Sequence, residues 1–191
     1  MSAFSEDLKR WMERDRRPRD GSASALRLRA RDVVVMLWRH GGVWPTAIYR
    51  MSSWCHRRGV RALPTIFERL NLVLFGIEIS SSIPIGPGLY IAHPVGTVLM
   101  ARRIGANASF IAAVTVGMRD THDFPILGDG VMVGAGARIL GGIKLGDGCT
   151  IGANAVVISD VPAGATAVGV PARVLPTRAK APDRFAKAFR K

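Results

Sequence analysis

The sequence has little cysteine and no long apolar run. Its two cysteines, Cys55 and Cys149, lie far apart without a paired spacing. This excludes a disulfide framework and a metal site of several thiolates, and we expect two free thiols in a reducing compartment. The longest apolar runs, 33–38 and 72–77, fall well short of the roughly 20 residues that span a bilayer. Residues 1–20 are charged almost throughout and lack the apolar stretch of a signal peptide, so we expect a cytoplasmic protein.

Acidic residues are scarce, and the resulting positive charge is uneven. The chain has 14 Asp and Glu against 27 Lys and Arg, a net charge of +13. Basic and acidic residues number 15 and 7 over 1–76, 5 and 6 over 77–172, and 7 and 1 over 173–191. Basic ends around a neutral middle favour anionic partners such as CoA phosphates, anionic lipid or nucleic acid. Improved solubility alone is the alternative explanation.

The N-terminal part has a helical pattern from Ser5 to about Phe75. Several apolar residues fall at spacings compatible with the apolar face of a helix: Trp11, Met36, Leu37, Trp38, Ile48, Met51 and Trp54. Proline and glycine at 17–22, 41–42 and 63–64 interrupt this pattern. The sequence therefore predicts three or four helices in a domain spanning residues 1–76.

Residues 77–174 have a period of six instead. Aliphatic residues recur at Leu127, Val133, Ile139, Leu145, Ile151 and Val157, and four of these are followed by glycine. The fourth residue after each is also apolar, and the same frame appears upstream at Ile79, Ile85, Ile91, Ile104, Phe110 and Val116. This period predicts a parallel solenoid in which the repeated aliphatic residue points inward and the second apolar position, including Cys149, lies near a corner. The remaining residues, 175–191, form a basic tail.

Two interruptions break the six-residue frame. One lies between Ile91 and Ile104, and the other is the segment 118–125, which contains His122 and two aspartates. Solenoids extrude such insertions to one side, often the binding side. We therefore expect the 118–125 segment to be a functional loop, with a passive linker as the alternative.

Several segments carry a family resemblance. The hexapeptide ladder, GIEIS and GPGLYIAHPVG, VTVG and AVGVPARVL, with ERDRRP and AIYRMSSWCHRRG upstream, resemble the bacterial serine acetyltransferases and the related colanic acid type O-acetyltransferases of exopolysaccharide clusters. The resemblance runs from about Glu6 to Val174. It implies a left-handed parallel β-helix behind a helical N-terminal domain, acetyl-CoA as co-substrate, and a homotrimer or dimer of trimers with active sites between chains.

The resemblance also implies catalytic residues. His93 occupies the position of the family's catalytic histidine, and a neutral alcohol attacking a thioester needs such a general base. Glu78, fifteen residues earlier, occupies the position of the family's acidic partner, which would hold the imidazole in the correct tautomer. The alternatives are a structural histidine and a solvated glutamate.

Three further residues are candidates for CoA binding. Gly117 resembles the family glycine where the CoA arm passes close to the backbone. Ala135 and Arg173 are extrapolated from the same resemblance, Arg173 because its segment and the basic tail would meet phosphates.

The acceptor side departs from the family. The family has an aspartate immediately before the catalytic histidine where this chain has Ala92, and an Arg-His pair where this chain has 123–124, an Asp-Phe pair. Asp15 matches an acceptor-side aspartate, and His122 is displaced by two positions from a second family histidine. Because the cation that would hold a serine carboxylate is missing, we expect a sugar or exopolysaccharide precursor as acceptor, with serine O-acetylation in cysteine biosynthesis as the alternative.

Other function classes fit less well. A three-histidine zinc site on a β-helix would need more than His93 and His122, the two histidines of the repeat region, so no metal is expected. A non-catalytic basic module is a remote alternative, but no nucleic-acid-binding motif is present, so no nucleic-acid partner is expected. Residues 181–191 are predicted to form a short amphipathic helix that docks peripherally at an anionic membrane, and a basic tail that only attracts CoA is the alternative.

Overall fold

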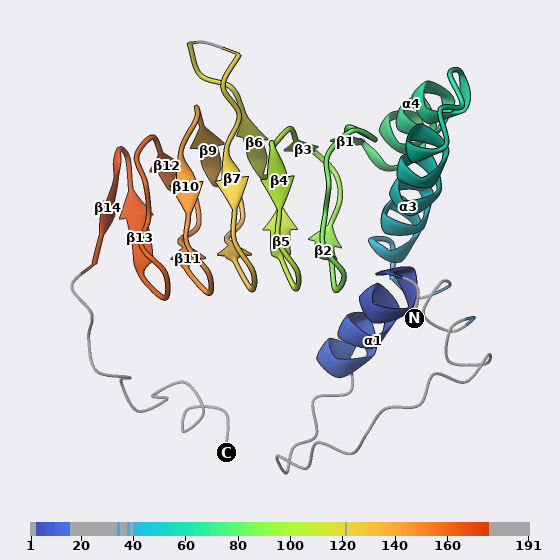
Figure 1. The fold of residues 1–191 in the computed structure, drawn as a ribbon. Coiled ribbons are helices and arrows are strands. Elements are labelled where there is room, and N and C mark those ends of the chain that lie inside the picture. Colours follow the sequence, from blue (N-terminus) through green and yellow to red (C-terminus); the bar gives the residue numbers. More distant parts are fainter. Residues whose placement is uncertain (1–2, 16–33, 35–37, 39, 121, 176–191) are drawn as a thin grey trace, which may run out of the picture.

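The computed structural model describes residues 3–15, 34, 38, 40–120 and 122–175, and it consists of a helical layer and a β-solenoid (Figure 1). Three helices are delimited: α1 (Ala3–Asp15), α3 (Val43–Arg57) and α4 (Leu63–Phe75). The Gly41-Gly42 interruption directly precedes α3, and Pro64 lies in the first turn of α4, where its missing N–H costs nothing. Gly76 ends α4 with a φ of 61°, a left-handed conformation that favours glycine.

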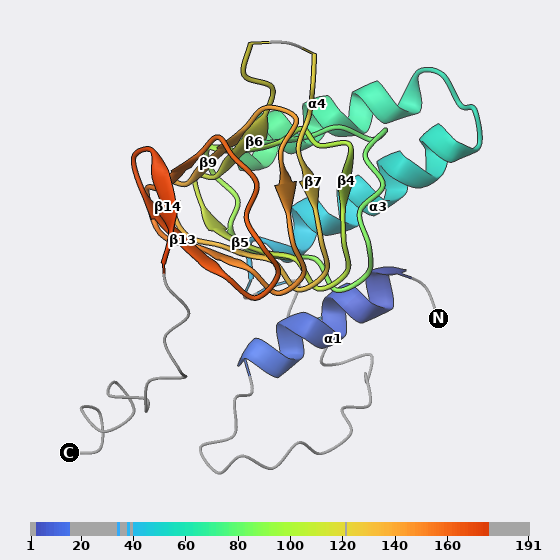
Figure 2. The ribbon, with the colours of Figure 1, turned by 60° about the vertical axis from the view of Figure 1, so that its left-hand side comes forward.

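The solenoid is built of three parallel sheets that form the sides of a prism (Figure 2). The first sheet, here sheet A, contains β1 (Ile77–Ile79), β3 (Thr97–Leu99), β6 (Thr115–Gly117), β9 (Arg138–Leu140) and β12 (Val156–Val157). Sheet B contains β4 (Arg103–Ile104), β7 (Ile126–Leu127) and β10 (Lys144–Leu145). Sheet C contains β2 (Tyr90–His93), β5 (Ser109–Ala112), β8 (Met132–Val133), β11 (Thr150–Ile151), β13 (Thr166–Gly169) and β14 (Ala172–Val174). Among the described strands, only the pair β13 and β14 is antiparallel.

The six-residue period is explained by how the coils stack. Every repeated aliphatic residue from Ile79 to Val157 is buried in one continuous core, and so is every corner position from Val131 to Val161. Glycine follows the aliphatic residue because the coils approach closely there: a Cβ at Gly146 would lie 2.4 Å from the Ala163 nitrogen. The predicted β-solenoid with N-terminal helices is confirmed.

Cys149 lies in a corner position, as predicted, and is fully buried. Burial in this apolar environment raises the pKa of the Cys149 thiol to about 11, because the thiolate would lose its hydration. Cys149 is therefore a packing residue of the core.

The helical layer caps the first coil through side chains that contact its backbone. Tyr49 donates a hydrogen bond from Oη to the Ile83 carbonyl at 2.6 Å, and desolvation raises its pKa. Asp7 of α1 accepts hydrogen bonds from the Arg50 guanidinium and from the Leu89 backbone N–H. Arg50 also donates to the Ile85 carbonyl at 2.7 Å. These long-range contacts fix both α1 and α3 on the solenoid.

An amphipathic helix usually turns its large apolar residues toward the core, but α3 does not. Met51 and Trp54 are half exposed, whereas the small polar residues Thr46, Ser52 and Ser53 are buried. Small side chains allow α3 to approach α4 and the first coil closely, and Ser52 satisfies its hydroxyl by donating to the Pro64 carbonyl. The larger apolar stripe therefore faces outward. No helix in the described ranges is long and apolar enough to cross a membrane.

Candidate active site

His93 lies at the end of β2, at the corner where the chain turns from sheet C into sheet A. Its neighbour Ile91 points into the core, Ala92 is half buried, and His93 itself is exposed. An exposed imidazole at this corner can reach a ligand from outside and accept a proton from a hydroxyl near neutral pH. The position is therefore compatible with the predicted general base.

Glu78 lies on the neighbouring coil. It is the outward residue of β1 between the buried Ile77 and Ile79, and its register partner is Val98 of β3. The corner after His93 contacts the start of β1, since the Gly96 N–H donates to the Gly76 carbonyl at 2.8 Å. Glu78 and His93 thus flank one corner on adjacent coils.

The side chains of Glu78 and His93 are not joined in the described part of the chain by a hydrogen bond or ion pair. Glu78 instead lines a cavity of about 110 Å³ beneath α4, together with Thr65, Glu68 and Arg69. The role of Glu78 as the partner of His93 therefore stays a prediction.

The other predicted site residues divide between the two edges of sheet A. Ala135, at the turn between β8 and β9, lies on the same corner as His93 but two coils further along. Gly117 ends β6 at the opposite edge, and the loop with His122 follows it directly. Within one chain, His93 and Ala135 therefore lie on one side of sheet A, and Gly117 and His122 lie on the other. The strands of this sheet are about three residues long, so the two sides are roughly 10 Å apart.

Gly117 has open space in front of it. The residue is buried, yet a Cβ built on it would meet no atom within 4 Å. The missing side chain is not needed for packing within this chain, so the space is available to a ligand that approaches the backbone.

The 118–125 loop projects from the solenoid between β6 and β7, in both Figure 1 and Figure 2. It is held by an ion pair between the Arg102 Nη2 and the Asp123 Oδ1 at 2.6 Å, with both side chains more than half exposed. Gly142 permits this contact because a Cβ there would lie 2.9 Å from the Asp123 Cβ. His122 is exposed on the loop, and Phe124 is half buried.

Two predicted residues lie away from these edges. Arg173 is exposed on β14, opposite Val168 at the last coil. Asp15 is the last residue of α1, and its side chain lies outside the described part of the molecule. The structure therefore does not place Asp15 relative to His93.

Two arginines near the site were not singled out from the sequence. Arg138 lies on the outward face of sheet A, where its guanidinium donates to the Ala113 carbonyl and to the Thr115 hydroxyl. Arg102 places a second cation beside the loop, although the sequence lacks the family's arginine there. The six-residue repeat could have identified Arg138 as an outward residue, because it directly precedes the inward Ile139. The contact of Arg102 with Asp123 depends on how the loop folds, so the sequence pattern does not reveal it.

The described residues contain no group of three or more His, Cys, Asp or Glu side chains that could hold a metal ion.

Comparison with known proteins gives consistent matches. Residues 124–159 match the family model described as bacterial transferase hexapeptide (six repeats). A serine acetyltransferase of Helicobacter pylori is 38% identical over 152 residues, which cover 76% of this chain and 88% of that protein. The serine acetyltransferase of Synechococcus elongatus is 33% identical over 150 residues, covering 76% of this chain. The chain spans 62% of the length of that relative.

Among solved structures, a serine acetyltransferase in complex with CoA superposes with a TM-score of 0.75 at 30% identity. The superposition covers 91% of this chain and 68% of that structure's chain.

Proposed function

Since the chain belongs to the serine acetyltransferase family of hexapeptide-repeat acyltransferases, we propose that it transfers an acetyl group from acetyl-CoA to a hydroxyl. The observation that carries this proposal is the exposed His93 at the corner of the first complete coil, within a chain 38% identical to a serine acetyltransferase over most of that relative's length. His93 would accept the proton of the attacking hydroxyl as the new ester bond forms. The CoA thiol then leaves with the proton that His93 returns.

Acetyl-CoA as co-substrate is supported by the CoA complex of a similar structure. Gly117, with no atom in front of its Cα, and the cation Arg138 on the face of sheet A are available to the CoA arm. Ala135 and Arg173 stay predictions for the same ligand. An N–H donor for the thioester oxygen would come from the backbone near these corners.

L-Serine is the acceptor that the names of the relatives support. This was the alternative in the sequence analysis, where the missing family cation argued against serine. The ion pair of Arg102 with Asp123 weakens that argument, because it places a guanidinium at the loop next to the position in question. Arg102 would serve as the substitute partner for a serine carboxylate.

A carbohydrate hydroxyl is the second candidate acceptor, favoured by one specific observation. Asp123 is an acidic residue where the family has a cation, and Phe124 beside it is apolar. A carboxylate accepts hydrogen bonds from sugar hydroxyls but repels a free carboxylate.

The acceptor assay separates these candidates. Thiol release from acetyl-CoA is measured with L-serine, homoserine, free sugars, nucleotide sugars and glycan fragments. A kcat/KM for L-serine above about 10⁴ M⁻¹s⁻¹, the ordinary enzyme range, would establish serine. Turnover of a carbohydrate with a much lower value for serine would establish the second candidate. No acceptor-dependent release with either class would contradict the proposed activity.

We propose assembly into a trimer or a dimer of trimers, which the resemblance to the serine acetyltransferases implies and which the division of the site supports. His93 and Ala135 at one edge of sheet A would meet Gly117 and His122 only if a second copy supplied the opposite edge. Light scattering should therefore report a multiple of three chains. A monomer with full activity would contradict this assembly.

Docking of residues 181–191 at an anionic membrane also stays a prediction, since that segment lies outside the described residues.

A further inference from the structure

The α3 and α4 helices expose an unusually apolar surface. Both pack on the first coil, α4 against β1 and α3 against β2, so their remaining faces point away from the solenoid (Figure 1). The large apolar side chains of these helices that are more than 45% exposed are Trp44, Met51, Trp54, Ile66, Val73 and Leu74. Val73 is 80% exposed, which a folded chain tolerates at isolated positions but seldom as a continuous face. We name this face the hairpin surface.

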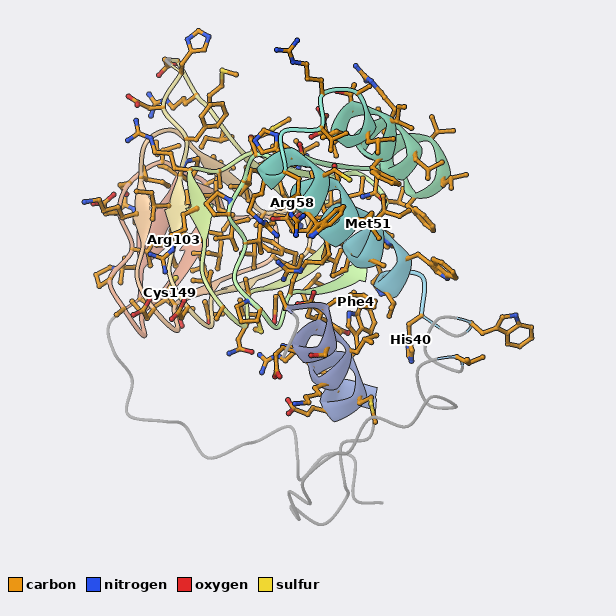
Figure 3. All side chains as sticks on the ribbon, turned by 45° about the vertical axis from the view of Figure 1, so that its right-hand side comes forward. Phe4, His40, Met51, Arg58, Arg103 and Cys149 are labelled. Atoms are coloured by element: carbon orange, nitrogen blue, oxygen red, sulfur yellow. The ribbon has the colours of Figure 1, made fainter. Side chains whose placement is uncertain are left out.

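An open groove extends the hairpin surface toward α1. Met51 and Trp54 line it from α3 and Phe4 lines it from α1, with a volume of about 420 Å³ (Figure 3). The groove gives the surface a recess that apolar groups of a partner can enter.

The charge around the hairpin surface has one sign. Four arginines of the two helices and their connection are exposed: Arg57, Arg58 and Arg61 at the turn between α3 and α4, and Arg69 within α4. Glu68 is the one acidic residue between 43 and 75, and its carboxylate is half buried, where it accepts a hydrogen bond from the Ser81 backbone N–H. Arg69 shares a cavity with Glu68 and Glu78, so the exposed charge without a carboxylate partner in the described residues is that of Arg57, Arg58 and Arg61.

Apolar side chains among uncompensated arginines match one kind of partner better than others. Two copies of this surface face to face would bring like charges together, which disfavours self-association. A nucleic acid would pair with the arginines but would leave the isoleucine, valine and leucine side chains of α4 without contact. An anionic bilayer satisfies both features, because aromatic and aliphatic side chains enter the acyl boundary while arginines remain at the headgroups.

We propose that the hairpin surface is a peripheral docking site for membranes that contain anionic phospholipid. The helices lie flat on the bilayer, with Trp54 and Val73 inserted at the headgroup boundary and Arg58 and Arg61 beside the lipid phosphates. This proposal uses neither the acetyl transfer nor the C-terminal tail, so it stands independently of the proposed function.

Vesicle sedimentation of the full-length chain tests the proposal. We expect co-sedimentation with phosphatidylglycerol vesicles at low salt, little with phosphatidylcholine vesicles, and release at high salt. Each arginine is worth about 1 kcal/mol beside an anionic surface, so R58Q/R61Q should lower partitioning by about tenfold or more. V73S/L74S removes apolar contacts without changing the charge and should lower partitioning by a similar factor.

Matched variants on the solenoid separate local binding from net charge. R103Q/K144Q removes two exposed charges of sheet B, and V170S removes one exposed apolar residue near the last coil. Both should partition like the parent chain. Equal loss in R58Q/R61Q and R103Q/K144Q would overturn the proposal, because it would show unspecific attraction of a basic protein.

Tryptophan fluorescence supplies a second readout, which begins with the parent chain. Of the four tryptophans, Trp11 is buried and Trp38 is exposed outside α3 and α4, whereas Trp44 and Trp54 lie on the hairpin surface. Brominated phosphatidylglycerol should quench a large part of the emission, and Trp54→Phe should reduce the quenched part. Absence of quenching, or V73S/L74S partitioning as well as the parent chain, would overturn the proposal. If V73S/L74S changes the mass in light scattering and not the partitioning, the surface is a contact between copies of the chain.

Discussion

Two regions of the molecule contain an arginine–aspartate ion pair with nearly the same N–O distance, but the two pairs are expected to contribute differently to stability. At the junction of helices and solenoid, Arg50 contacts Asp7 at 2.7 Å, and the Asp7 side chain is 1% exposed. At the loop, Arg102 contacts Asp123 at 2.6 Å, and both side chains are more than half exposed. The pairs are alike in distance and differ in burial, so the surroundings decide what each pair contributes.

The junction pair is one part of a network. Asp7 also accepts the Leu89 N–H, and Arg50 also donates to carbonyl groups of 85 and 86. Breaking one member leaves several buried polar groups without partners. The loop pair is exposed to water, which replaces either partner at little cost. We therefore expect the junction to control stability and the loop to control ligand contacts.

The largest expected effect is at the junction. Asp7→Ala leaves the Arg50 guanidinium partly uncompensated and the Leu89 N–H unsatisfied, which should lower the free energy of unfolding by about 3 to 5 kcal/mol. Urea unfolding followed by circular dichroism measures this change. The matched control Glu6→Ala removes a more accessible carboxylate of the same helix, which pairs with Lys9 at 3.0 Å. A loss below about 1 kcal/mol in Asp7→Ala would show that the network does not hold α1 in place.

The second effect separates the two regions by activity. His93 lies on the coil next to the junction, and His122 lies on the loop. His93→Ala should lower kcat by about a hundredfold or more with little change in the KM for acetyl-CoA, because a general base contributes that much.

The comparison with His122→Ala sharpens this assignment. That variant should change mainly the KM for the acceptor, since His122 is a predicted acceptor contact. His56→Ala, an exposed histidine of α3, is the control and should behave like the parent chain. Near-normal turnover in His93→Ala would exclude it as the base.

The two regions also differ in how well the sequence predicted them. The six-residue period identified both buried positions of each six-residue repeat, since the same physical constraint, a flat strand stacked on its neighbours, recurs along the chain. The glycines that follow the aliphatic residues belong to the same constraint. Residues such as Ile139 and Cys149 could therefore be placed inside without any knowledge of tertiary structure.

The junction and the loop do not repeat, and their contacts join residues far apart in sequence. Nothing local to Asp7 indicates that it would meet Arg50 and Leu89, and nothing local to Arg102 indicates Asp123. The outward stripe of α3 is a similar case: Met51 and Trp54 have helical spacing, but spacing alone does not show which face packs inward. His93 was singled out by the family resemblance, and its exposed corner became visible only in the structure. Its relation to Glu78 depends on side-chain orientations that a sequence period does not fix.

A smaller effect concerns the solenoid away from both regions. Burial raises the pKa of the Cys149 thiol to about 11, above its ordinary value of 9.0. The neutral thiol is favoured in the folded state, so its contribution to stability is complete below pH 9 and is lost as the pH rises toward 11.

Urea unfolding between pH 8 and 11 should therefore show a decrease that Cys149→Ala reduces. Alkylation by iodoacetamide at pH 8 should be slow at Cys149 in the folded chain and fast after unfolding. Rapid alkylation of the folded chain would contradict the burial of this corner.

The smallest expected effect on stability is at the loop. Arg102→Ala removes an exposed ion pair, so the free energy of unfolding should fall by less than about 1 kcal/mol, and the loss should shrink further at high salt. A double-mutant cycle with Asp123→Ala measures the coupling energy between the Arg102 and Asp123 side chains. This energy should be several times smaller than that from the cycle of Asp7→Ala with Arg50→Ala.

The same Arg102→Ala variant is informative in the acceptor assay. If Arg102 holds the carboxylate of serine, the KM for L-serine rises while the KM for acetyl-CoA stays unchanged, and Arg102→Lys recovers part of the loss because it keeps the charge. An unchanged KM for L-serine would remove Arg102 from the acceptor site, and a coupling energy equal to that of the junction pair would show that burial is not what distinguishes the two regions.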